Sequence, residues 1–153
     1  MFGRFMIAIV LGAVLGIERE LVGKEAGVRT ETLVAAGACV FAMIGLALPY
    51  IVSAQTGNLA DVIARNSGFL QVIANIVIGI GFLGTGLIIK TGGHAHGVTT
   101  AAIIWATAAI GVLVGIGLIE FATVAALFIA LLLYVLRKLN VSEKLEEHPG
   151  TPD

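Results

Sequence analysis

Long uninterrupted apolar runs dominate this chain. Three of them, Leu33–Val52, Phe69–Ile89 and Val98–Leu118, contain 20 or 21 residues without a charge. Because about 20 apolar residues in a helix cross a hydrocarbon core of roughly 30 Å, each run predicts a membrane-spanning helix. A fourth run, Phe121–Leu136, approaches this length when the three preceding residues are included, with the carboxylate of Glu120 at the interface.

A shorter apolar run, Phe5–Ile17, opens the chain. Its 13 residues fit either a short first helix with Arg4 snorkelling outward or the core of a signal peptide. We favour the helix, because no A-x-A cleavage pattern follows. The sequence therefore predicts an all-α membrane domain of five transmembrane helices over residues 1–139. A polar tail over residues 140–153 is predicted to be disordered and cytoplasmic.

The distribution of Lys and Arg sets the predicted orientation. With the N-terminus outside, the inner face carries seven of these residues and the outer face carries only Arg4 and Arg65. The positive-inside rule therefore predicts an outer N-terminus and a cytoplasmic C-terminus. The inner residues are Arg19, Lys24, Arg29, Lys90, Arg137, Lys138 and Lys144.

The composition supports a membrane protein: 58% of residues are hydrophobic, 12% are charged, and the mean hydropathy is +1.04. The net charge of −1 gives no electrostatic reason to expect a nucleic-acid partner. The single Cys39 excludes an intramolecular disulfide, and we interpret it as a small packing residue.

An offset of seventy residues aligns nine identical residues within forty positions, among them Gly16 with Gly86 and Thr30 with Thr100. This pattern predicts that the first two helices recur as the third and fourth, in the same orientation. The alternative is two independent hairpins that share a glycine-rich composition.

Glycine recurs along the third predicted helix, at Gly79, Gly81, Gly84 and Gly86. Such a segment either packs closely against a neighbour or breaks to line a ligand path, and we favour close packing. The pairs Gly12-x-x-x-Gly16 and Gly111-x-x-x-Gly115 supply the same small-residue spacing in other helices.

Two amides, Gln71 and Asn75, lie one turn apart on the third helix. They are suited either to bonding across a helix interface or to lining a polar cavity, and we favour the interface.

The loop between the first two helices, GIERELVGKEAGVRTE, carries seven charges of both signs. We expect an organised loop rather than a solvated one, with ion pairs Glu20–Lys24 and Arg29–Glu18, and with Thr30 capping the second helix. The seven charged residues are Glu18, Arg19, Glu20, Lys24, Glu25, Arg29 and Glu31.

The fourth helix begins at Thr99 and Thr100, whose hydroxyls are expected to cap it. Trp105 lies deeper and is expected to pack between helices with its indole bonded to a neighbour. His94 and His96 form an H-x-H pair in the preceding hairpin. Without a nearby Cys or carboxylate we expect neither a metal nor a cofactor there. No catalytic arrangement is recognisable, so we expect no enzyme.

Four segments together resemble the MgtC/SapB family of bacterial membrane proteins: GIERE (16–20), AGVRT (26–30), GIGFLGTG (79–86) and GVTTAAIIWATAAIG (97–111). The resemblance implies a cytoplasmic-membrane protein of about five helices, linked to growth in low magnesium, acid and other stress, and to virulence in pathogens. Members were long described as magnesium transporters. The virulence protein is regarded as a regulator that acts on membrane partners, including the proton-translocating ATP synthase.

The chain also departs from the family pattern. Glu31 stands where members usually have His, Asn75 stands where they have Gln, and the C-terminal ACT-like domain of the larger members is not expected here. By resemblance, the positions expected to matter are Glu18, Arg19, Glu20, Arg29, Thr30, Asn75, Gly79, Gly81, Gly84, Gly86, Thr99, Thr100 and Trp105.

Three hypotheses for function follow. The first is a non-enzymatic homo-oligomer, most simply a dimer in membrane lipid, that modulates ion or proton homeostasis by contacting other membrane proteins through its charged first loop. The second is a transporter or channel with a path past Asn75 and the helix-three glycines, against which stands the expected absence of Asp or Glu at mid-depth. The third is a scaffold that moves nothing.

Overall fold

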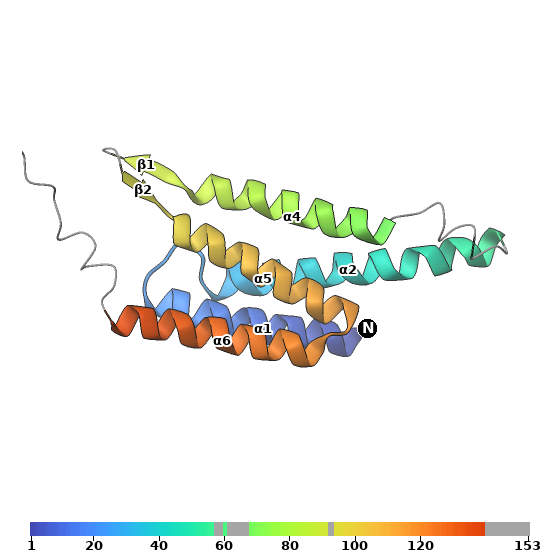
Figure 1. Ribbon diagram of the computed structural model, residues 1–153, viewed down its shortest axis with the longest axis horizontal. Helices are drawn as coiled ribbons and strands as arrows, with labels where there is room; N and C mark the ends of the chain where they lie inside the picture. Colours follow the sequence, from blue (N-terminus) through green and yellow to red (C-terminus); the bar gives the residue numbers. More distant parts are fainter. Residues whose placement is uncertain (57–59, 61–67, 92–93, 140–153) are drawn as a thin grey trace, which may run out of the picture.

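Five helices and one short β-hairpin form an elongated bundle (Figure 1), described by a computed structural model for residues 1–56, 60, 68–91 and 94–139. The helices lie roughly along the long axis of the molecule, and the hairpin extends from the end at which α4 leads into α5. The elements are α1 (Phe2–Leu21), α2 (Val28–Thr56), α4 (Gly68–Leu87), β1 (Ile89–Thr91), β2 (His94–His96), α5 (Val98–Ile116) and α6 (Ile119–Lys138).

Four helices, α2, α4, α5 and α6, are long and apolar enough to cross a membrane. The all-α membrane architecture is thereby confirmed. The first helix is 20 residues long but carries Arg4, Glu18 and Arg19, so a fifth span stays a prediction. Helix α2 begins at Val28, five residues before the predicted start of its span. Arg29 and Glu31, which fall in the predicted loop, therefore belong to the helix.

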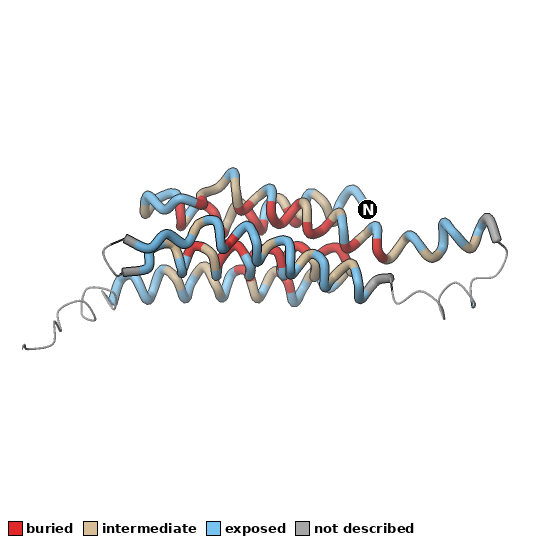
Figure 2. The backbone as a smooth tube through the Cα atoms, turned by 90° about the horizontal axis from the view of Figure 1, so that it is seen from above, coloured by how far each residue is buried: buried red, intermediate tan, exposed pale blue. Residues whose placement is uncertain are grey.

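The core lies where α1, α2 and α5 pack together (Figure 2). Half of the apolar segment of α5 is buried, against 11% of the corresponding segments of α4 and α6. Cys39 is fully buried in this core beside Leu15 and Val114, which confirms its role as a packing residue. Peripheral side chains such as Phe82, which is 84% exposed, point outward, as expected where lipid replaces water as the solvent.

Glycines bring the three central helices into backbone contact. A Cβ at Gly16 would lie 2.5 Å from the Cα of Val28, and a Cβ at Gly115 would lie 2.7 Å from the carbonyl oxygen of Cys39. A Cβ at Gly12 would meet α2 equally closely. The two small-residue pairs found in the sequence are therefore contact surfaces against α2.

The glycines of α4 behave differently. The helix is continuous, so it is not broken at these positions. A Cβ at Gly84 would lie 3.3 Å from the Cβ of Ala101, but a Cβ at Gly79, Gly81 or Gly86 would meet nothing within 4 Å. The prediction of close packing is therefore wrong for three of these four glycines, because α4 lies at the edge of the bundle.

Glycines with positive φ also form the turns at both ends of α5. Gly97 precedes the helix with a φ of 82°, and Gly117 follows it with a φ of 102°.

Arg4 donates a hydrogen bond from Nη1 to the carbonyl oxygen of Gly115 at 2.9 Å. The snorkelling of Arg4 stays a prediction; its guanidinium satisfies a carbonyl in the last turn of α5, where the helix dipole favours a cation.

The β-hairpin pairs Ile89 with His96 and Thr91 with His94 in an antiparallel register.

The seventy-residue repeat stays a prediction. Its partners Gly16 and Gly86 differ in environment, because one is packed against α2 and the other borders open space. The predicted tail, residues 140–153, lies outside the described residues.

Candidate functional site

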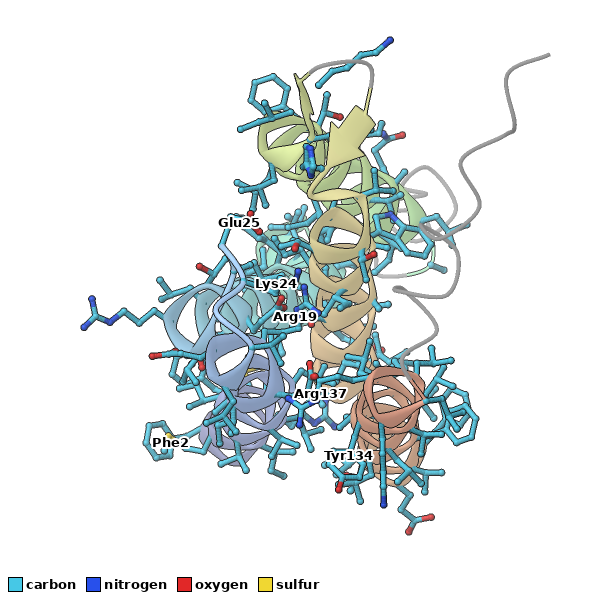
Figure 3. The ribbon with its side chains drawn as sticks, turned by 90° about the vertical axis from the view of Figure 1, so that its left-hand side faces the viewer. Phe2, Arg19, Lys24, Glu25, Tyr134 and Arg137 are labelled. Carbon is cyan, nitrogen blue, oxygen red and sulfur yellow. The ribbon has the colours of Figure 1, made fainter. Side chains whose placement is uncertain are left out.

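A buried arginine organises one end of the bundle. Arg19, in the last turn of α1, is only 4% exposed, and its Nη2 donates a hydrogen bond to the hydroxyl of Thr100 at 3.0 Å. Its Nη1 lies 3.9 Å from a carboxylate oxygen of Glu18. Figure 3 looks along the bundle from this end and shows Arg19 lying between α1 and α5. A buried charge is tolerated because it is paired and hydrogen-bonded.

Thr100 links this arginine to the turn between α1 and α2. Its hydroxyl accepts from Arg19 and donates to Oε2 of Glu25 at 3.3 Å. The predicted capping role is therefore wrong: Gly97 is the N-cap of α5, no side chain caps it, and Thr99 is exposed. One chain of hydrogen bonds thus joins α1, α5 and the turn.

Glu25 completes this chain at the surface of the protein. A hydrogen bond from its own backbone N–H lowers the pKa of Glu25 below its ordinary value. The Thr100 hydroxyl and the nearby positive charges also lower this pKa, while partial desolvation opposes them. The carboxylate therefore stays ionised and keeps its hydrogen bond at neutral pH.

A second carboxylate fixes the start of α2. Oε2 of Glu20 accepts a hydrogen bond from the backbone N–H of Val28 at 2.9 Å, satisfying an amide that the helix leaves unpaired. Thr30 lies inside the helix, so its predicted capping role is wrong. The predicted pairs Glu20–Lys24 and Arg29–Glu18 are also wrong, because Glu20 binds this amide and Glu18 faces Arg19.

The turn itself is compact. Gly23 adopts a φ of 68°, and its backbone N–H bonds to the carbonyl oxygen of Glu20 at 3.0 Å. The backbone N–H of Lys24 bonds to the carbonyl oxygen of Arg19 at 3.1 Å. The turn is therefore ordered, while Lys24 and Arg29 remain exposed beside it.

Glu31 is the residue that sequence reasoning missed. It is fully buried in α2, and a Cβ at Gly12, midway along α1, would lie 2.7 Å from its carbonyl oxygen. Its carboxylate lies near the buried hydroxyl of Thr107 without forming a well-shaped hydrogen bond to it, and neither group has another partner among the described residues. Glu31 lies in the first turn of α2, before the predicted span Leu33–Val52, so the expected absence of an acidic group at mid-depth stays a prediction.

A signal for Glu31 was present in the sequence. Val34, Ala35 and Ala38 follow it at intervals of three, four and seven residues, and all three are buried on the same face of α2. Extending that face back by one turn places Glu31 inside the bundle rather than in the loop.

A groove of about 690 Å³ lies on another side of α2, between α2 and α4. Arg29 and Thr30 line it at the α1–α2 turn, and Asn75 lines it further along. The amide of Asn75 accepts a hydrogen bond from Gln71 at 3.1 Å within the same helix, so the predicted bond across an interface is wrong. The rest of the lining is apolar or glycine, including Phe41 and Gly79.

Two further predicted residues lie outside these clusters. Trp105 is 51% exposed on α5, so the prediction that it packs between helices is wrong. His96 is exposed on β2. In the part of the chain that the structure describes, no group of three or more His, Cys, Asp or Glu is arranged to hold a metal ion.

The fold and the site define the class: a polytopic helical membrane protein whose central helices enclose charged side chains. Residues 5–142 match the MgtC family, and the chain belongs to that family. It is 41% identical over 132 residues to Protein MgtC of Brucella abortus (strain 2308), covering 86% of this chain and 49% of that protein. The chain therefore spans about half the length of this relative.

Two other relatives extend the comparison. Protein SrpB of Synechococcus elongatus is 35% identical over 145 residues, which cover 90% of this chain and 75% of that protein. The putative magnesium transporter YhiD of Escherichia coli (strain K12) is 33% identical over 147 residues, which cover 92% of this chain and 64% of that protein. No solved structure matches the chain.

Proposed function

We propose that this protein is a non-enzymatic regulator that adjusts magnesium or proton homeostasis under stress by binding other membrane proteins. The contact surface is the exposed rim of the α1–α2 turn, centred on Lys24 and Arg29. The observation that carries the proposal is the hydrogen-bond chain Arg19–Thr100–Glu25, which runs from the interior to the surface and fixes this turn against α5.

A fixed turn is well suited to binding. A surface held in one conformation loses little conformational entropy when a partner docks, so more of the contact energy appears as affinity. Glu20 adds a second restraint by holding the first amide of α2. Exposed charges of both signs on such a support give specificity and steer the encounter. Homo-oligomerisation in the membrane, with a dimer favoured, and contact with the ATP synthase belong to the same proposal.

The test combines growth and flux. Cells that lack their own family member are complemented with this chain or with Arg29→Ala and grown at low magnesium. We expect the parent to restore growth and Arg29→Ala to fail, with equal amounts in the membrane. Arg137→Ala is the matched control, because it removes an exposed cation from the same end of the bundle, where Arg137 lies 5.7 Å from the Tyr134 ring.

Magnesium and proton flux into liposomes separates regulation from transport. The regulator hypothesis expects no flux above that of empty liposomes from protein shown to be inserted and folded. Flux that rises with the amount of protein and disappears in Arg29→Ala contradicts it. Loss of Arg29→Ala from the membrane assigns a structural role to this residue and removes the support for a contact surface.

Transport is the second candidate, and one observation favours it. Glu31 is fully buried in the first turn of α2, with no well-formed hydrogen bond to its carboxylate among the described residues. Ionisable groups inside a membrane frequently mark ion or proton pathways, and a relative is named a putative magnesium transporter. The groove that reaches Asn75 is less suited to this role, because its lining is mostly apolar.

The same liposomes test the second candidate. A pathway through the central helices predicts flux that Glu31→Gln abolishes and that Thr107→Val reduces. Glu31→Gln keeps the side-chain shape while removing the ionisable carboxyl group, so folding is expected to survive. Flux that is unchanged in Glu31→Gln excludes a pathway through this carboxylate.

A further inference from the structure

The groove between α2 and α4 has the shape of a site for one lipid chain. Along α2 it extends from Arg29 to Phe41, a distance of about 18 Å at the rise of an α-helix. One leaflet of a bilayer has a hydrocarbon depth of about 15 Å, half of the core thickness. The groove therefore matches a single leaflet, whereas a partner helix that spans the membrane needs twice that length.

The polar groups of the groove are unevenly placed. Arg29 and Thr30 lie in the first turn of α2, at the end of the bundle where charged residues gather. Arg29 is exposed, and it is the one charged side chain among the described residues that line the groove. A guanidinium beside a hydroxyl presents several donors to a phosphate group, and Arg binds phosphate in a bidentate manner.

Glycines keep the groove open on both of its walls. Gly37 of α2 and Gly79 of α4 both line it, and a Cβ at either position would meet nothing within 4 Å. The other side chains in the lining include Leu33, Phe41 and Leu83, which suit a hydrocarbon chain. An apolar channel with a cation at one end complements an anionic amphiphile in both shape and charge.

We propose that this groove binds one anionic phospholipid from the leaflet on the side of the α1–α2 turn. Its phosphate lies at Arg29 and Thr30, and one acyl chain follows the α2–α4 groove towards Asn75. The lipid site shares Arg29 with the proposed contact surface, but its test is separate, because lipid binding by the purified protein needs neither a protein partner nor ion flux.

The experiment is native mass spectrometry of the detergent-solubilised protein with added phosphatidylglycerol or phosphatidylcholine of identical acyl chains. We expect about a tenfold preference for the anionic lipid, the scale that a charge-assisted contact supplies. Arg29→Gln is expected to abolish this preference while leaving binding of phosphatidylcholine unchanged. Lys24→Gln, which removes a neighbouring exposed cation outside the groove, is expected to retain the preference.

Filling the groove gives a second and independent arm. Gly79→Leu places a side chain in open space on the groove wall, and binding of both lipids is expected to fall several-fold. Gly81→Leu is the matched control, because it makes the same change on the same helix, also in open space, away from the groove lining. Circular dichroism of all variants confirms that the helices are intact.

Three outcomes overturn the proposal. One is an undiminished preference for phosphatidylglycerol in Arg29→Gln. Another is equal lipid binding by Gly79→Leu and Gly81→Leu. The third is a change in oligomer mass in Gly79→Leu without a change in lipid binding, which assigns the groove to a second copy of the chain.

Discussion

Gly16 offers the sharpest test of how the central helices pack. Replacing it with Ala introduces a Cβ that would lie 2.5 Å from the Cα of Val28, 2.9 Å from its backbone nitrogen and 3.0 Å from the carbonyl oxygen of Gly27. Comfortable contacts between carbon atoms begin at about 3.5 Å, so α1 and α2 must separate by roughly 1 Å. All three neighbours are backbone atoms, which cannot rotate away as a flexible side chain can.

The magnitude follows from two opposing effects. Overpacking a filled core costs about 1–3 kcal/mol. Replacing Gly by Ala within a helix contributes about 1 kcal/mol in the opposite direction. Gly81→Ala in the middle of α4 isolates the second effect, because its Cβ meets nothing within 4 Å. The difference in unfolding free energy between Gly16→Ala and Gly81→Ala should therefore be about 1–3 kcal/mol, the overpacking cost alone.

The assay is a denaturant titration of each variant in the same detergent, followed by far-UV circular dichroism. We expect Gly81→Ala to unfold at a slightly higher midpoint than the parent protein, and Gly16→Ala to unfold below Gly81→Ala. Equal midpoints for the two variants would refute the direct contact between α1 and α2. A rise in the midpoint of Gly16→Ala above that of Gly81→Ala would refute it more strongly.

Two further predictions concern the ends of α5. Arg4→Gln removes the guanidinium that bonds the carbonyl oxygen of Gly115, so we expect a loss of about 1 kcal/mol in the same titration, partly restored by Arg4→Lys. The pKa of Glu25 is lowered in the folded protein, so its stabilising contribution is complete above the unfolded pKa of about 4.3 and is lost as pH falls through the lower folded value. Unfolding midpoints measured from pH 7 to pH 3 should show this decline, and Glu25→Gln should flatten it; an equal decline in both proteins contradicts the assignment to Glu25.

The helices were predictable because apolar length alone marks them. A run of twenty uncharged residues has few alternatives to a membrane helix, so the spans over α4, α5 and α6 agree with the sequence to within a few residues. The start of α2 was not predictable in this way, because Arg29 and Glu31 interrupt the apolar run while remaining helical. A charge ends a hydrophobic pattern without ending a helix.

Which face of each helix points inward was harder to predict. In a soluble protein the polar face identifies the surface, but lipid is as apolar as the core, so this contrast disappears. Gly81 and Gly84 lie in one glycine-rich segment, yet one borders open space and the other touches α5. Trp105 is exposed for the same reason, since an aromatic ring is stable in lipid as well as between helices.

The polar cluster was only partly predictable. Its members were recognisable as charged residues at a membrane boundary, but Arg19 and Thr100 are 81 residues apart, and no local spacing joins them. Capping was the simplest local role for Thr100, and a tertiary contact replaced it. The buried guanidinium of Arg19 needs a hydrogen-bond acceptor. This need outweighs the preference of the Thr100 hydroxyl for capping its own helix.

Arg29 and Glu31 make the competing hypotheses separable by experiment. Residues two apart in a helix differ by about 200° in direction, so the two side chains leave α2 on nearly opposite sides. One faces the groove at the edge of the bundle, and the other is enclosed by the central helices. A change at Arg29 therefore perturbs surface contacts while leaving the interior intact, and Glu31→Gln does the reverse. If low-magnesium growth depends on Arg29 alone, function requires a contact at this surface, with a protein partner or with the lipid, and the lipid-binding experiment separates the two. Dependence on Glu31 alone requires a process inside the bundle.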